Sequence, residues 1–130
     1  MKGLRYWPAV LMASLLISCS AAQRLPNAAY SGDLEQVKCL IAQGISLSQH
    51  DNRHGRTAIH MAAMQGHVDI IRYLLSQGVE IQVQDINGLT ALHLAVWKGR
   101  LASVKYLVSQ GADINGHRNK NKFTLLNFIQ

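Results

Sequence analysis

Apolar residues recur at helical spacing in paired short segments through the middle of the chain. In residues 58–65, and again in residues 91–98, apolar side chains lie three and four positions apart. This spacing predicts two short amphipathic helices. Each is followed by a second segment of the same kind, at 68–76 and 101–109, with a glycine between the two. The pattern therefore predicts helix pairs joined by tight turns.

The helix pairs repeat with a fixed period. Five residues recur 33 positions later: Thr57, His60, Gly66, Leu74 and Gly78 correspond to Thr90, His93, Gly99, Leu107 and Gly111. The threonines can cap the first helix of each pair, and the glycines can end the helices because glycine adopts left-handed dihedral angles without penalty. A repeat of this length predicts a stacked architecture, because one helix pair cannot bury its apolar face alone.

The repeated unit resembles the ankyrin repeat, whose pattern includes Gly-x-Thr-Pro-Leu-His-x-Ala-Ala and a later Gly-Ala-Asp-x-Asn. Residues 57–63 and 90–96 match the first motif, with alanine in place of proline. The resemblance implies an all-α fold, a solenoid of stacked helix-turn-helix units with hairpin turns. The expected repeat domain spans 27–130, with a partial unit at 27–50, full units at 51–84 and 85–118, and a partial unit at 119–130.

The first 18 residues have the pattern of an export signal. Lys2 and Arg5 precede a short apolar run that would not span a bilayer comfortably. The run ends in Leu16-Ile17-Ser18-Cys19, which resembles the lipobox of bacterial lipoproteins. That resemblance implies cleavage before Cys19, acylation of its thiol with fatty acids such as palmitate, and residence at the outer membrane, facing the periplasm. Residues 19–26 would form a tether.

Two alternatives remain at this stage. An ordinary secretory signal could be cleaved among the small residues 19–22, which would leave a periplasmic or secreted protein without an anchor. Cys39, the only other cysteine, lies in an apolar helical pattern and is predicted to be a small buried residue. A disulfide between Cys19 and Cys39 is the alternative interpretation.

The candidate chemistry favours a structural role for the histidines. His60 and His93 occupy equivalent positions, and the family resemblance implies that each bonds backbone groups of the neighbouring loop. His50 and His54 lie in a turn without a matching carboxylate or thiol cluster, so we expect no metal. We find no pattern typical of a catalytic triad, a phosphate-binding loop or a carboxylate pair. We therefore expect neither an enzyme nor a cofactor.

Charge adds little to this picture. The chain carries a formal charge of +6 from 13 basic and 7 acidic residues. Without Lys2 and Arg5, 11 basic residues remain against 7 acidic ones, which leaves +4. This mildly basic charge says little about partners by itself. The basic residues of the turns suit an acidic protein surface or anionic lipid head groups; they are Arg53, His54, Arg56, Arg118, Lys120 and Lys122. Export would remove the chain from nucleic acid.

Partners of ankyrin domains usually dock on the hairpin turns and the inner helices. The two residues before each helix-ending glycine, together with turn residues, are therefore predicted to contact a partner. These are Tyr30, Arg53, Arg56, Met64, Gln65, Ile86, Asn87, Leu89, Trp97 and Lys98. Alternatively, the large apolar residues only cover adjacent helices and the charges are ordinary solvated turn residues.

The expected function is a non-catalytic protein–protein interaction module, lipid-anchored and facing the periplasm. It would hold, shield or inhibit a partner protein, for example as an immunity-type inhibitor. One alternative is a small structural or stress-protection envelope protein that self-associates. A metal-binding protein or an enzyme is the third, less favoured hypothesis.

Overall fold

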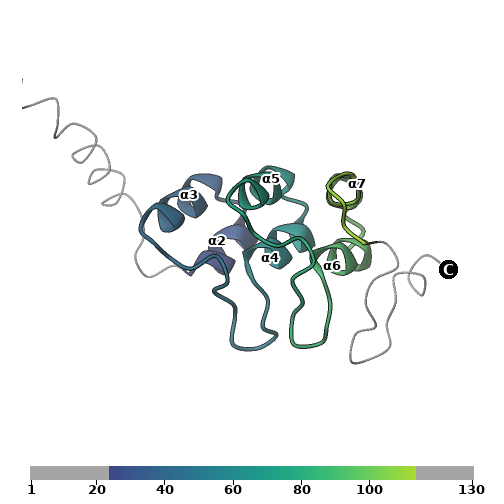
Figure 1. Ribbon diagram of the computed structural model, residues 1–130, viewed down its shortest axis with the longest axis horizontal. Coiled ribbons are helices and arrows are strands. Elements are labelled where there is room, and N and C mark those ends of the chain that lie inside the picture. Colours follow the sequence, from purple (N-terminus) through teal and green to yellow (C-terminus); the bar gives the residue numbers. More distant parts are fainter. Residues whose placement is uncertain (1–23, 114–130) are drawn as a thin grey trace, which may run out of the picture.

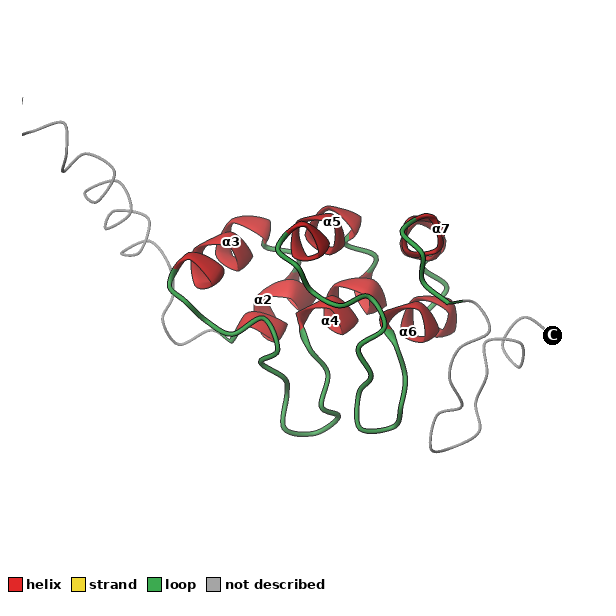
Figure 2. Ribbon diagram, in the orientation of Figure 1, coloured by secondary structure: helices red, strands yellow, loops and turns green. Residues whose placement is uncertain are grey.

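The computed structural model describes residues 24–113 (Figure 1). These residues form six helices, in two layers. The helices are α2 (Leu25–Ser31), α3 (Leu34–Ala42), α4 (Ala58–Gln65), α5 (Val68–Ser76), α6 (Ala91–Trp97) and α7 (Leu101–Ser109). Helices α2, α4 and α6 form the inner layer, and α3, α5 and α7 form the outer layer. Two hairpin loops project from the inner layer on the same side (Figure 2). The predicted all-α repeat solenoid is confirmed.

The helix boundaries follow the predicted signals. Helices α4, α5 and α7 have the predicted bounds, whereas α6 ends one residue early, at Trp97, with Lys98 as its C-cap. Gly66 ends α4 in the left-handed region, at φ 78°. The first helix begins at Leu25, two residues before the predicted start of the repeat domain.

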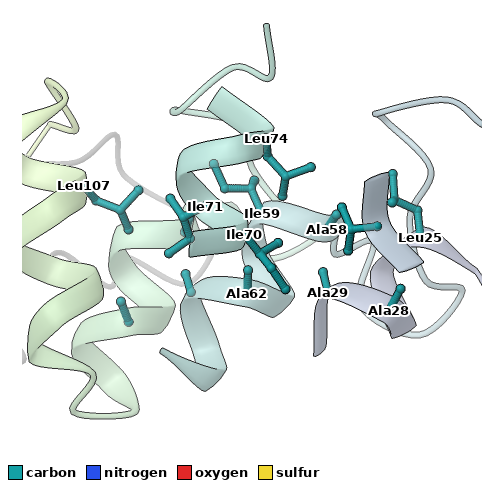
Figure 3. Packing of buried hydrophobic residues seen from close by; sticks show 14 of the residues in the cluster. Leu25, Ala28, Ala29, Ala58, Ile59, Ala62, Ile70, Ile71, Leu74 and Leu107 are labelled. Atoms are coloured by element: carbon teal, nitrogen blue, oxygen red, sulfur yellow. The ribbon is translucent and has the colours of Figure 1, made fainter. Parts of the chain in front are cut away.

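The core lies between the two layers (Figure 3). Small residues on the inner helices let these helices pack closely against one another. These residues are Ala28, Ala29, Ala62, Ala63, Ala91 and Ala95, all buried. Larger aliphatic residues of the outer helices fill the space above them, among them Leu40, Ile70, Ile71, Leu74 and Leu107. Each such buried side chain contributes roughly 1.5–3 kcal/mol of transfer free energy.

Gly32 allows the first two units to approach closely. It has φ +82°, and a Cβ atom at this position would lie 2.7 Å from Cε1 of His67. The ring of His67 can lie there because glycine has no side chain, and its Nε2 is 3.2 Å from the carbonyl oxygen of Tyr30. The His67 side chain therefore links the second unit to the end of α2.

Cys39 differs from its prediction. Its side chain is half-buried rather than fully buried, and its sulfur is disulfide-bonded. The prediction of a small, fully buried residue is wrong, and the alternative interpretation of a disulfide at Cys39 fits its sulfur. Its disulfide partner, the predicted leader, the acylation at Cys19 and the partial unit 119–130 all lie outside the described residues. Within residues 24–113, no helix is both long enough and apolar enough to cross a membrane.

Candidate partner-binding surface

The two hairpin loops are tied to each other by a buried ion pair. Nε of Arg56 donates to Oδ2 of Asp85 at 3.4 Å, and both side chains are largely shielded from water. The other oxygen of Asp85 accepts the backbone N–H groups of Asn87 and Leu89, both at 2.9 Å. The hairpins therefore form one connected edge.

This geometry corrects the prediction for Arg56. We expected an exposed charge that contacts a partner, but only 9% of the residue is exposed. Its guanidinium is used to neutralise Asp85, since a buried carboxylate is costly without a counter-charge. Arg56 is therefore a structural residue of the hairpin edge.

Asp51 organises the first hairpin in a similar way. Its carboxylate accepts the backbone N–H of Arg56 at 2.6 Å and that of His54 at 3.3 Å. Burial by itself would raise the pKa of Asp51, but these hydrogen bonds, together with the nearby imidazole of His54, hold the pKa below its usual value of 3.8. The turn is therefore built around a carboxylate that stays ionised at neutral pH.

His60 bonds the neighbouring loop, as the family resemblance implied. Its Nδ1 accepts the backbone N–H of Thr57 at 3.1 Å, and its Nε2 donates to the carbonyl oxygen of Leu89 at 3.0 Å. Burial lowers the pKa of His60 below 6.5, although the Leu89 carbonyl and the charge of Asp85 oppose this. His60 is thus a neutral structural side chain that joins two units.

His93 repeats only half of this arrangement. Its Nδ1 accepts the backbone N–H of Thr90 at 3.2 Å, which closes the same capping box. Its Nε2 is buried and has no hydrogen-bond partner among the described residues.

Within residues 24–113, no group of three His, Cys, Asp or Glu side chains is arranged to hold a metal ion.

The predicted contact residues fall into two groups at opposite ends of the inner helices. At the hairpins, Arg53 and Ile86 are exposed, while Asn87 and Leu89 are half-buried. At the C-terminal ends, the exposed residues are Tyr30, Trp97 and Lys98. The rise along a helix as short as α6 separates the two groups by about 10 Å.

The apolar stripe predicted at the helix ends is interrupted in the middle. Met64 is 7% exposed and Gln65 is half-buried. The side chain of Arg100 lies over this position, and its Nε donates to the carbonyl oxygen of Met64 at 3.0 Å. The prediction that Met64 presents an apolar surface is therefore wrong, because the next unit covers it.

Trp97 is the most prominent aromatic residue at this end. Its side chain is 54% exposed, and Nζ of Lys98 lies 4.7 Å from its ring centroid. Tyr30 is 50% exposed at the corresponding end of α2. Exposed Trp and Tyr side chains are typical anchors of protein interfaces.

Sequence reasoning missed Arg24, which occupies the N-cap position of α2. Thr57 and Thr90 hold the same position in the later units. The helix-ending glycines Gly32 and Gly66 are 34 positions apart, so the same register places Gln23 opposite Thr57. Helix α2 is one residue shorter than α4, and its N-cap is therefore Arg24. Arg24 lines a pocket next to the first hairpin.

Comparison with known proteins agrees with this architecture. Residues 25–117 match the family model described as ankyrin repeats in three copies, and the chain therefore belongs to the ankyrin-repeat family. Domains of this family generally mediate protein–protein interactions.

The chain is also similar to parts of several larger proteins. It is 44% identical over 71 residues to L-asparaginase of Dirofilaria immitis, which covers 55% of this chain and 12% of that protein. It is 39% identical over 72 residues to the probable E3 ubiquitin-protein ligase XBOS32 of Oryza sativa subsp. japonica, and this match covers 54% of this chain and 14% of that protein. Over 70 residues it is 37% identical to human 26S proteasome non-ATPase regulatory subunit 10, and this match covers 54% of this chain and 31% of that protein. The chain spans less than a third of each of these relatives, so the likeness concerns the repeats.

Proposed function

We propose that this chain is a non-catalytic binding domain that holds, shields or inhibits a partner protein at the bacterial cell envelope. The observation that carries the proposal is the exposed ring of Trp97 beside Lys98, on a repeat domain of an interaction family. A tryptophan with more than half of its surface in water is not needed for the core. An immunity-type inhibitor of an incoming toxin is one form of this function.

We also propose that a lipid anchor at Cys19 holds the domain at the outer membrane, facing the periplasm. The support is the sequence Leu16-Ile17-Ser18-Cys19 after a short apolar run. Several acyl chains on one residue give stable membrane attachment, whereas a single chain gives only reversible binding. The short segment between Cys19 and α2 would keep the repeats near the membrane surface.

Incorporation of palmitate tests the anchor. We expect membrane-bound protein to incorporate labelled palmitate, and mass spectrometry of the full chain checks that the label lies at Cys19.

Cys19→Ala is the matched variant for the anchor. It should abolish palmitate labelling and membrane retention. Protein that lacks the label in the parent chain would instead indicate ordinary signal cleavage.

The partner surface is tested at Trp97. Trp97→Ala should weaken the partner complex by roughly 2 kcal/mol, which is about a thirtyfold higher Kd, because a buried aromatic anchor is lost. The partner is first identified by crosslinking in envelope preparations, and the Kd is then measured by calorimetry. Val108→Ala, on the exposed side of α7, is the control and should leave the Kd unchanged. Equal affinities for the parent, Trp97→Ala and Tyr30→Ala proteins would contradict this surface assignment.

A further inference from the structure

A pocket of about 300 Å³ lies between the start of the inner layer and the first hairpin loop. Its lining comes from three segments that are distant in sequence. Arg24 and Asn27 belong to the start of α2, Met61 to α4, and Asp51, Asn52 and Arg53 to the hairpin. The pocket therefore opens on the hairpin side of the inner helices, away from the Trp97 end.

Two positive charges at this pocket form no ion pair with any of the described residues. The ion pairs within residues 24–113 join Glu35 to Lys38, Asp51 to His54, and Asp85 to Arg56. None of them involves Arg24 or Arg53, and both of these residues are exposed. The pocket is thus lined by two exposed arginines that no ion pair within residues 24–113 engages.

The one acidic residue in the lining is already committed to the hairpin. The two oxygens of Asp51 accept hydrogen bonds from the backbone N–H groups of His54 and Arg56 and lie beside the ring of His54. Only 20% of its side chain is exposed. Asp51 is therefore a weak competitor for the two arginines.

We propose that this pocket receives the carboxylate of an aspartate or glutamate from an acidic segment of the partner protein. The planar guanidinium groups of Arg24 and Arg53 match the geometry of a carboxylate and form strong charge-assisted hydrogen bonds with it. The side-chain amides of Asn27 and Asn52 can donate to the same group. The half-buried Met61 offers an adaptable apolar contact for the methylene groups of the acidic side chain.

This inference rests on the proposed function, because it names the kind of partner that the domain recognises. A protein partner fits a domain of an interaction family. The lining of the pocket combines Arg53 of the hairpin with residues of the inner helices α2 and α4. It therefore defines a binding point separate from Trp97.

The test uses random short peptides displayed on phage and selected against the full chain in detergent. We expect the enriched peptides to share an Asp or Glu at one position, and the change of this residue to Asn or Gln to weaken binding about tenfold. Arg24→Gln and Arg53→Gln should each weaken binding of the parent peptide by a similar factor. In the double variant, the acidic and amide peptides should bind with nearly equal affinity, measured by fluorescence anisotropy.

Arg72→Gln, the same chemical change on the exposed side of α5, is the control and should not alter binding. Peptides that lack an acidic residue, or that bind the Arg24→Gln and Arg53→Gln variants as tightly as the parent, would overturn this inference alone. A selection that yields no binding peptide would count against the proposed interaction function itself, and against this inference with it.

Discussion

Replacing Asp85 with alanine should lower the free energy of unfolding by about 3–5 kcal/mol. The carboxylate of Asp85 is completely buried and accepts hydrogen bonds from Arg56, Asn87 and Leu89. Without it, the guanidinium of Arg56 is buried with no counter-charge, and two backbone N–H groups of the second hairpin lose their acceptor. Breaking a buried pair in this way is far more costly than the net contribution of the pair itself. Urea unfolding of the full chain, followed by circular dichroism, measures the loss.

Two further variants make the Asp85 experiment specific. Asp85→Asn keeps an oxygen acceptor for the backbone of the turn but removes the charge, so it should destabilise the protein less than alanine. Glu35→Ala removes one partner of an exposed pair, whose Nζ–Oε1 distance to Lys38 is 3.7 Å, and should have almost no effect. If Asp85→Ala proves as mild as Glu35→Ala, the hairpin edge does not depend on the buried pair.

The role of Arg56 changes how binding data on this chain are interpreted. A charged residue in a turn suggested a solvated contact, and its partner Asp85 is 29 positions away along the chain. Weaker partner capture by an Arg56→Ala variant would therefore reflect a disturbed hairpin edge as much as a lost contact. Arg53 is the suitable residue for testing basic contacts at the hairpin, because it is exposed and has no ion-pair partner within residues 24–113.

The local signals in the sequence were sufficient for the fold. Threonine at the N-cap and glycine at the helix end act within one helical turn, so the bounds of α4 followed directly from them. The repeat period then predicted the stacking, and the bond from His60 to the neighbouring loop followed from the family resemblance.

The surface was harder to predict, because exposure depends on side chains from the next unit. Met64 is covered by Arg100, which is 36 positions later. No pattern within one repeat distinguishes it from Trp97, which occupies the equivalent position and is exposed. Arg24 was missed for a related reason: its importance comes from the approach of the first hairpin to α2, which joins residues of two different units.

Replacing His60 with alanine should cost about 3 kcal/mol of stability. The substitution leaves a cavity in the core and removes the acceptor for the backbone N–H of Thr57 and the donor to the carbonyl oxygen of Leu89. His93→Ala is the matched control, because His93 has the same capping contact with Thr90 but no partner for Nε2 among the described residues. The His93→Ala variant should lower the free energy of unfolding by about 1 kcal/mol less than His60→Ala does, which is the net contribution of one hydrogen bond. Equal losses in urea unfolding would show that the bond to Leu89 does not stabilise the stack.

The pH dependence of the same variant gives a second readout. Burial holds the pKa of His60 in the folded protein below its ordinary value of 6.5. As the pH falls below 6.5, the unfolded chain takes up a proton that the folded protein does not, so the folded state loses stability. Each such histidine contributes a slope of up to about 1.4 kcal/mol per pH unit, which ends once the lowered pKa is reached. The pKa of His93 is lowered as well, again by burial, so His60→Ala should flatten this slope without removing it. A parent protein whose stability does not change between neutral pH and the pKa of its carboxylates would show that neither imidazole is held neutral by the fold.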